Sequence, residues 1–538
     1  MTRSPIAACQ AAFDIRTLED ANNDGVIDVL NETRSTLRSS SVAVARASFV
    51  VRALVSAAVI VVIAAGCGGS ESTTEPESSI AVVTVSPGGN GTVWVGGTST
   101  FTVRAEDSQG DPVSGVIFAW TSSNGSVATV NVVGVVRGVA EGVATITATA
   151  EGHSGTATVA VRVLQLASVD PGTFQTCGLA TDGAAFCWGT NFAGLLGAGA
   201  TTETCPGFFE PGPCATSPVA VLGGITFASL SVANGFTCGL DTTGAAYCWG
   251  VNGGGRLGTG DELDTRFPVA VVGGLTFTSV SAGASHVCGL TATGAAYCWG
   301  ENGDGQLGTL AELLAFCQFI GPCSTTPVAV AGGLTFTSLS AAEAGLHTCG
   351  VTEAGAAYCW GSNAFGGLGN GKITGMSPTP IAVAGGLNFV SVSAGGAHTC
   401  GVLASGEAYC WGLNWAGQLG LGTAGTDSAT PLPVSGGLVF ESVSAGDAHT
   451  CGVATNGAAY CWGNNFDQQL GDGTAVDQLV PTAVAGGLTF ASVSASWFHT
   501  CGLTTDGLGY CWGANEFGQV GDGGTEPSDV PVRVLGQP

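Results

Sequence analysis

Positive charge is scarce in this sequence of 538 residues, which holds 13 lysines and arginines against 39 aspartates and glutamates. Six residues of each sign precede Cys67, so the rest of the chain keeps the full excess, with 33 acidic and 7 basic residues. Phosphate backbones are bound by lysine and arginine, which displace counterions, so the sequence argues against a nucleic-acid partner. The acidic surface is expected to serve solubility, with attraction of a basic partner as the alternative.

Charged residues of either sign make up only 10% of the chain, and methionine occurs only twice. Glycine is abundant, with 88 residues, and valine, threonine, serine and alanine dominate between the glycines. This composition favours short strands and tight turns over long helices. A hydrophobic content of 45% argues against disorder, which requires low hydrophobicity.

Familiar catalytic motifs are missing as well. The sequence has no phosphate-binding Gly-Lys loop, no His-Glu-x-x-His and no Gly-x-Ser-x-Gly, and no Cys-x-x-Cys pair suggests a metal site. The carboxylates are scattered in loops, where such residues usually form turns. We therefore expect a protein that is not an enzyme and that needs no cofactor or metal.

A targeting segment is expected at residues 46–67. Two arginines precede an apolar run at residues 53–66, which is too short to span a bilayer comfortably, since about 20 residues are needed. The layout is that of a signal peptide, and Ala64-Ala65-Gly66-Cys67 resembles the lipobox of bacterial lipoproteins. The resemblance implies lipidation at Cys67 and a place in the bacterial envelope, at the outer membrane or cell surface. An ordinary signal peptide with an incidental cysteine is the alternative.

A polar segment lies on each side of this signal. Residues 1–45 form an unusually long leader. We interpret this length as a sign that the true translation start lies further along the chain than Met1. Within the leader, residues 20–31 resemble a calcium-binding EF-hand loop, but Asn31 replaces the bidentate glutamate, so no working site is predicted. Residues 68–79 are polar, contain proline and are expected to be a flexible tether.

Residues 80–163 are predicted to form a separate small β-sandwich. Strand-like runs such as residues 98–103 and 144–149 alternate with turn signals such as Gln109-Gly110-Asp111-Pro112. The unit resembles the bacterial Ig-like group 2 domain, notably at Trp120-Thr121-Ser122-Ser123-Asn124 and over residues 138–146. The resemblance implies a spacer domain in which Trp120 is a core residue.

Self-similarity extends over residues 166–538. A Cys-Gly phrase, a glycine turn and Cys-Trp-Gly recur seven times, about 50 residues apart, with the tryptophans at Trp188, Trp249, Trp299, Trp360, Trp411, Trp462 and Trp512. Each unit has room for four short strands and must stack on its neighbours to bury both faces of its sheet. Kelch repeats share the period and the glycine pairs.

The detailed match is to the regulator of chromosome condensation family, whose repeats resemble residues 412–420, Gly-Leu-Asn-Trp-Ala-Gly-Gln-Leu-Gly. The resemblance implies an all-β chain in which a seven-bladed β-propeller follows the N-terminal Ig-like β-sandwich. We expect strands from the two ends of the propeller to meet in one blade and so close the ring.

Most of the 20 cysteines belong to the repeats. Each repeat pair is separated by nine residues around a glycine turn, which places its two cysteines opposite each other in a hairpin, within disulfide range. The predicted repeat disulfides join Cys177 to Cys187, Cys238 to Cys248, Cys288 to Cys298, Cys349 to Cys359, Cys400 to Cys410, Cys451 to Cys461 and Cys501 to Cys511. Two more are expected in insertions, from Cys205 to Cys214 and from Cys317 to Cys323. Disulfides indicate an oxidising compartment.

Five of the six histidines occupy one repeat position, which holds Gln175 and Phe236 in the first two units. A position that accepts histidine, glutamine and phenylalanine is predicted to be structural rather than catalytic. The repeated tryptophans and tyrosines are likewise expected to pack between blades.

Departures from the repeat point to a binding surface. The two insertions, about residues 201–217 and 310–326, occur at the same offset and should project from the same face. Aromatic and apolar residues on stapled loops suit a pre-organised interface, although each insertion could instead form its own small cluster. The candidate partner-binding residues are Phe208, Phe209, Phe316, Phe319, Ile320, Trp415 and Trp497. The expected function is a lipid-anchored surface protein that binds a protein or glycan; a propeller enzyme (lyase or hydrolase) or a secreted inhibitor is the alternative.

Overall fold

The computed structural model describes residues 80–88, 91–201, 203–207, 210–311, 314–317 and 321–537. The predicted leader, calcium-loop resemblance, signal peptide, lipidation site Cys67 and tether lie outside these residues. So do four of the candidate binding residues, Phe208, Phe209, Phe319 and Ile320. Across the described ranges, no helix has the length and apolar character required to cross a membrane.

The first domain is a small β-sandwich built on alternating side chains. Its strands are β1 (Val82–Ser86), β2 (Thr92–Trp94), β3 (Thr98–Thr100), β4 (Thr102–Glu106), β5 (Ala119–Ser122), β6 (Ala128–Val130), β7 (Val135–Gly138), β8 (Gly142–Ala150) and β9 (His153–Arg162). They form three sheets, ordered β1-β4, β2-β9-β8-β5 and β3-β7-β6. Along β8 buried positions alternate with half-buried ones, as expected for a strand with one face on a core.

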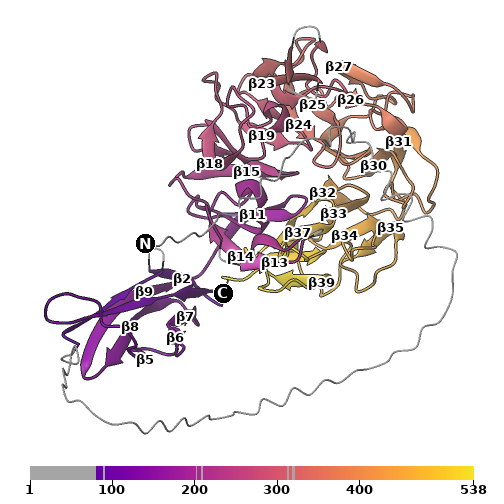
Figure 1. The fold of residues 1–538 in the computed structure, drawn as a ribbon. Helices are drawn as coiled ribbons and strands as arrows, with labels where there is room; N and C mark the ends of the chain where they lie inside the picture. The colour runs from indigo at the N-terminus through magenta and orange to yellow at the C-terminus, as the bar shows by residue number, and fades with distance from the viewer. Residues whose placement is uncertain are drawn as a thin grey trace, which may run out of the picture. The chain divides into compact units, whose positions relative to one another are not determined.

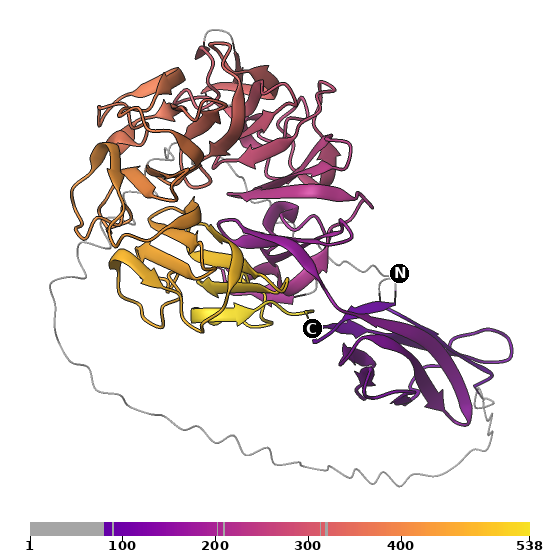
Figure 2. The same ribbon diagram turned by 180° about the vertical axis from the view of Figure 1, so that it is seen from behind.

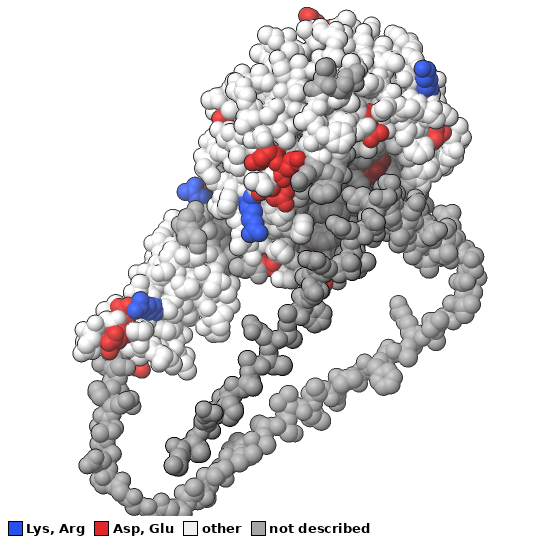
Figure 3. All heavy atoms as spheres, turned by 45° about the horizontal axis from the view of Figure 1, so that its top comes forward, with Lys and Arg blue, Asp and Glu red and all other residues white. Residues whose placement is uncertain are grey.

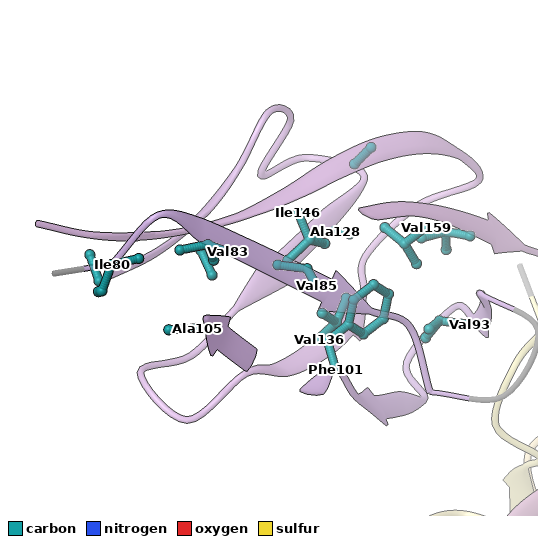
Figure 4. Close-up of a cluster of buried hydrophobic side chains, with 14 residues drawn as sticks. Ile80, Val83, Val85, Val93, Phe101, Ala105, Ala128, Val136, Ile146 and Val159 are labelled. Carbon is teal, nitrogen blue, oxygen red and sulfur yellow. The ribbon is translucent and has the colours of Figure 1, made fainter. Parts of the chain in front are cut away.

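The core of this domain gathers around Phe101, Val136, Ile146 and Val159, all fully buried (Figure 4). Trp120, expected in the core, is only half-buried and packs against the edge of this cluster. The Trp120 ring packs directly against Gly134, where a side chain would not fit, because a Cβ atom there would lie 2.8 Å from the ring. The domain contains no cysteine, so apolar packing is what holds it.

Seven antiparallel sheets follow, numbered here from the first to the seventh sheet in chain order. The first comprises β10 (Leu166–Pro171), β11 (Gln175–Ala180), β12 (Ala185–Thr190), β14 (Gly212–Ala220) and β13 (Glu203–Cys205). The second has β15 (Phe227–Ala233), β16 (Phe236–Asp241), β17 (Ala246–Gly250) and β18 (Thr265–Ala270). The third has β19 (Ser279–Ala282), β20 (His286–Leu290), β21 (Ala296–Glu301), β23 (Gly321–Ala329) and β22 (Ala315–Cys317).

The remaining sheets have four strands each. They are β24 (Phe336–Ala341), β25 (His347–Thr352), β26 (Ala357–Ser362) and β27 (Met376–Ala382); β28 (Phe389–Ala394), β29 (His398–Leu403), β30 (Ala408–Gly412) and β31 (Ser428–Pro433); β32 (Phe440–Ala445), β33 (His449–Ala454), β34 (Ala459–Gly463) and β35 (Gln478–Ala483); and β36 (Phe490–Ala495), β37 (His499–Thr504), β38 (Gly509–Gly513) and β39 (Ser528–Arg533). The first strands of successive sheets contact one another, so they surround the axis of a propeller (Figure 1).

The repeat motif is explained by contacts between neighbouring sheets. Each repeated tryptophan is buried and donates its indole N–H to a carbonyl in the preceding sheet's loop; Trp462, for example, bonds Gln418 at 2.9 Å. The glycine that ends each Gly-x-Leu-Gly phrase has no room for a side chain, since a Cβ at Gly420 would lie 2.9 Å from that indole nitrogen. Asn414 fixes the same loop, accepting the Leu419 N–H at 3.1 Å.

The ring closes differently from our expectation. Strands from the two ends do not share a sheet, because the first unit begins with its own inner strand, β10, and the last ends with its own outer strand, β39. Closure instead uses packing of the first sheet on the seventh, as the two views show (Figures 1 and 2). Leu166 and Trp188 pack with Val520 and Val534 at this seam, and the Leu164 N–H donates to the Gly536 carbonyl at 2.6 Å.

Candidate functional site

One end of the propeller carries all of its long loops, and we call it the loop face. Neighbouring strands run antiparallel within a sheet, so the loop joining the first and second strands and the loop joining the third and fourth lie at the same end. The opposite end has only the tight turn inside the central hairpin and the connection to the next sheet. A ligand therefore meets varied loops on one face and repetitive turns on the other.

Both insertions project at the loop face, as their common offset predicts. Each adds a short fifth strand, β13 or β22, to the outer edge of its own sheet. Disulfides join the two sides of these hairpins, Cys205 to Cys214 and Cys317 to Cys323, with Cα atoms 5.8 Å apart in both. Phe316 lies on β22 and is 82% exposed, so it does not cluster over the rim.

The seven repeat pairs of cysteines form disulfides across each central hairpin, as predicted. In the first sheet Cys177 and Cys187 are direct partners in the strand register, with Cα atoms 4.1 Å apart. The other six pairs repeat this arrangement: Cys238 with Cys248, Cys288 with Cys298, Cys349 with Cys359, Cys400 with Cys410, Cys451 with Cys461, and Cys501 with Cys511. All these cysteines are buried. The disulfides hold the second and third strands of every sheet together and so fix the positions from which the loops start.

Aromatic side chains, four of them exposed and one half-buried, recur on the loop face. They follow the buried asparagine of the third-to-fourth loop by one or two positions: Phe192, Phe365, Trp415, Phe466 and Phe517. Phe192 and Phe466 are 69% and 74% exposed, whereas Phe517 is half-buried. We call these five residues the aromatic ring. Four of them were missed in the sequence, although their shared spacing from the repeated asparagine could have revealed them.

Phe365 occupies a strained backbone position. Its φ is 63°, in the left-handed region, where the corresponding residue of the second sheet is Gly254 with φ 68°. A non-glycine residue there costs about 1 kcal/mol or more. The side chain does not recover this cost by burial, because it is 47% exposed. The corresponding residue of the first sheet, Ala193, has φ 51°, so the left-handed conformation belongs to the loop and not to the aromatic side chain.

Trp497 lies in the loop between β36 and β37, half-buried, with its ring centroid 5.7 Å from that of Phe498. Phe498 stacks on Phe174 at 5.9 Å, and Phe174 meets Phe517 edge-on at 5.2 Å. The structure thus joins Trp497 to the aromatic ring, while Trp415 lies two sheets away from the seventh. The two residues share the loop face without touching.

A pocket of about 570 Å³ opens beside this aromatic cluster. Phe174, Phe192, Phe517, Leu195 and Val251 line it, and so does Arg256. The guanidinium of Arg256 is already engaged, because it donates to Glu301 at 3.0 Å and to the Gly253 carbonyl at 2.9 Å, and it lies 5.7 Å from the Phe236 ring centre. Most of the described residues that line the pocket are apolar; Glu210 adds a carboxylate, and Arg256, the one cation among them, is already paired.

Carboxylates gather where the loops between first and second strands surround the axis. Asp170 is the last residue but one of the inner strand β10. Its two oxygens accept the Val232 N–H at 2.8 Å and the Ser494 hydroxyl at 3.0 Å, and burial raises its pKa to about 6. Burial raises the pKa of Glu343 well above its usual value, and the negative charges of Asp170 and Asp447 raise it further. Sequence reasoning missed this group because its members come from three different sheets.

The family of the chain follows from its match to a known domain. Residues 267–538, just over half of the chain, match the RCC1-like domain. The chain belongs to the RCC1-like domain family. Residues 243–290 also match the regulator of chromosome condensation (RCC1) repeat, and residues 79–161 match the bacterial Ig-like domain (group 2).

The regions of known proteins that match this RCC1-like propeller are only parts of those proteins. The ultraviolet-B receptor UVR8 of Arabidopsis thaliana is 35% identical over 137 residues, 25% of this chain and 31% of UVR8. The human probable E3 ubiquitin-protein ligase HERC6 is 32% identical over 128 residues, 23% of this chain and 12% of that ligase. The matches therefore span less than a third of these curated relatives.

Two solved structures show the same fold. The crystal structure of human WBSCR16 is 22% identical with a TM-score of 0.58, covering 65% of this chain and 94% of WBSCR16. Prp20p from Saccharomyces cerevisiae is 22% identical with a TM-score of 0.55, covering 69% of this chain and 87% of that chain. The RCC1-like propeller is a binding and regulatory fold, and it supports a role in protein interaction.

The histidine position of this RCC1-like propeller is structural. Each histidine contacts the threonine hydroxyl of the next sheet, as His347 does with Thr399 at 2.9 Å, and that hydroxyl donates to a loop carbonyl. The histidine Nε2 must therefore carry the proton. Burial lowers the pKa of His286, His398, His449 and His499 to about 3 and that of His347 to about 4. An imidazole ring that is neutral, buried and hydrogen-bonded to a buried threonine is poorly placed for catalysis.

The described part of the RCC1-like chain contains no group of three or more histidine, cysteine, aspartate or glutamate side chains that could hold a metal ion. Most of the surface in the view of Figure 3 is uncharged, and acidic side chains outnumber basic ones there. The strongest candidate for function is thus a binding surface, the loop face, with an apolar aromatic perimeter and an acidic centre.

Proposed function

We propose that this chain is an exported, lipid-anchored binding protein that holds a protein partner on the loop face of its propeller. The exposure of the aromatic ring carries the proposal, because five of seven corresponding loops place an aromatic side chain at the same end of the molecule. Aromatic residues are enriched among the anchors of protein interfaces. The Ig-like domain would then act as a spacer between the anchor and the propeller.

The rigidity of the loops supports this role. Each loop starts from a disulfide-bonded hairpin, and its buried asparagine holds it from inside, as Asn465 does by bonding Leu470 and the carbonyl of Thr474. A surface that is ordered before binding loses little conformational entropy on association. Prp20p, a structural relative, has been studied for its binding to Gsp1p and histones, which supports a protein rather than a glycan as the partner.

The disulfides support export. The nine disulfides found among the described residues are typical of an oxidising compartment, outside the reducing cytosol. Lipidation at Cys67 is tested by mass spectrometry of the mature N-terminus. A lipid-modified Cys67 supports the anchor, and an unmodified Cys67 in the mature chain contradicts it.

The binding face is tested by capture of partners from envelope extracts with the full chain. The double variant Trp415→Ala/Phe466→Ala removes two members of the aromatic ring. Val439→Ala, in a connection at the opposite end, is the matched control, since Val439 is 44% exposed. We expect the control to retain the partner and the double variant to lose it. Retention by both variants, or loss by both, would contradict the proposal.

A further inference from the structure

The loops between the first and second strands, the inner loops, surround the mouth of the ring. In the third sheet three residues, 283–285, separate Ala282 from His286, and in the fourth sheet five residues, 342–346, separate Ala341 from His347. Glu343 lies in this extended loop. The extension is specific to the fourth sheet, so the repeat itself does not require a carboxylate at this place.

The carboxyl group of Glu343 lacks the contacts that usually stabilise a negative charge. Its Oε1 atom is buried and has no hydrogen-bond partner among the described residues. The charges that act on its carboxyl group are those of Asp170 and Asp447, both negative. The ion pairs Arg104–Glu106 and Arg256–Glu301 do not involve Glu343. A carboxyl group with a buried oxygen that lacks a partner is costly to ionise, so a cation that reached it would be favoured.

Other polar groups at the mouth also lack partners. Thr173 follows Gly172 in the first inner loop, as Asp447 follows Gly446 in the sixth and Trp497 follows Ser496 in the seventh. Thr173 is 1% exposed, yet its hydroxyl has no hydrogen-bond partner among the described residues, and the indole N–H of Trp497 has none either. Three unequal side chains at one repeat position, two of them unsatisfied, point to a ligand rather than to packing.

We propose that the mouth of the ring on the loop face binds one arginine side chain of the protein partner, with Glu343 as its main counter-charge. This inference rests on the proposed function and names the chemistry of the partner. A planar guanidinium offers five donors, enough for carboxylates that approach from different sheets. Its flat face stacks on aromatic rings, which Trp497 and its neighbour Phe498 supply beside the mouth.

The site is tested with small probes, because the partner is unidentified. N-acetyl-arginine amide is titrated into the full chain and followed by NMR at the indole N–H of Trp497, assigned with Trp497→Phe. N-acetyl-citrulline amide has nearly the same shape without the charge, and N-acetyl-lysine amide has the charge without the planar fork. We expect weak, saturable binding of the arginine probe and affinity at least about tenfold lower for citrulline. The lysine probe should bind between the two.

Glu343→Gln should reduce the affinity for the arginine probe about tenfold, because it removes the one group there that can release its proton and ionise against the bound guanidinium. Glu407→Gln, in a turn at the opposite end, removes the same charge and is the control. The thermal midpoint of Glu343→Gln should not fall, since an amide is easier to bury than a carboxylate. Equal binding of arginine and citrulline, or equal losses in the two variants, would overturn the inference. If Trp415→Ala/Phe466→Ala abolishes partner capture while the arginine probe fails to bind, the proposed function stands and this inference falls.

Discussion

At the scale of single residues, two repeat positions on neighbouring sheets change together. The histidine position of the second sheet holds Phe236, and the threonine position that it faces in the third sheet holds Val287. In the five sheets that hold a histidine at this position, its Nε2 lies 2.7–2.9 Å from a threonine oxygen. At the histidine junctions the pair is hydrogen-bonded, and at the Phe236–Val287 junction it is apolar on both sides, so neither arrangement leaves the Nε2–H without an acceptor. In the first sheet Gln175 instead donates to the Ala233 carbonyl at 2.8 Å.

This pairing predicts compensation between two substitutions. Thr348→Val leaves the Nε2–H of His286 buried without an acceptor and should lower the free energy of unfolding by about 1–3 kcal/mol. Adding His286→Phe reproduces the Phe236–Val287 pair and should recover most of that loss. Urea unfolding with the disulfides intact measures both values. A double variant as unstable as the sum of the two single variants would show that the positions are not coupled.

At the scale of elements, the inner strands form a ring of hydrogen bonds that is altered at one place. In five of the junctions a serine accepts a backbone N–H of the next inner strand at 2.9–3.0 Å; Ser444, for example, accepts the Ala495 N–H. In the first sheet the Ser-Ala pair is replaced by Asp170-Pro171. Because Pro171 has no N–H, Ser494 cannot accept from it and instead donates to Asp170. At the junction of the first and seventh sheets, a side chain–side chain hydrogen bond thus replaces the bond from a backbone N–H to a serine.

Restoring the repeat at the seam tests this explanation. Asp170→Ser keeps an acceptor for the Val232 N–H but removes the charged acceptor of Ser494, so it should lower the free energy of unfolding by about 1–2 kcal/mol. Asp170→Ser/Pro171→Ala adds the missing N–H and should recover stability relative to the single variant. Thermal unfolding of the oxidised protein gives the comparison. No difference between the single and double variants would contradict the assigned role of Pro171.

The strands of the propeller could be predicted from the sequence where they follow the repeat. The spacing of Cys177 and Cys187 around a glycine turn indicated the strand register, since facing positions in a hairpin are counted from the turn. Closure was predicted wrongly, because whether two chain ends share a sheet depends on packing across the seam rather than on the repeat. The aromatic ring and Glu343 were missed for a related reason. Their exposure and electrostatics depend on other sheets, which a single repeat does not show.

At the scale of the whole molecule, burial of ionisable groups links stability to pH. Five histidines titrate near pH 6.5 when unfolded and near pH 3 or 4 in the native protein, so between these values the unfolded chain binds up to five more protons. Stability is therefore lost as the pH falls below about 6.5. Asp170 and Glu343 act in the opposite direction, because their raised pKa values let the native protein hold protons that the unfolded chain has released.

The histidines should dominate this balance. Five protons against two leave a net excess of about three in the unfolded chain near pH 5, which corresponds to a loss of about 4 kcal/mol per pH unit. We expect the thermal midpoint to fall steeply between pH 6.5 and pH 4.5. The variant His286→Phe/Thr348→Val lacks one of the five histidines, so the slope of its unfolding free energy should be shallower by about 1.4 kcal/mol per pH unit. Two outcomes would show that the histidine side chains are not held neutral in the native propeller. One is a thermal midpoint that stays constant or rises on acidification; the other is an equal slope of unfolding free energy against pH for the wild-type protein and the variant.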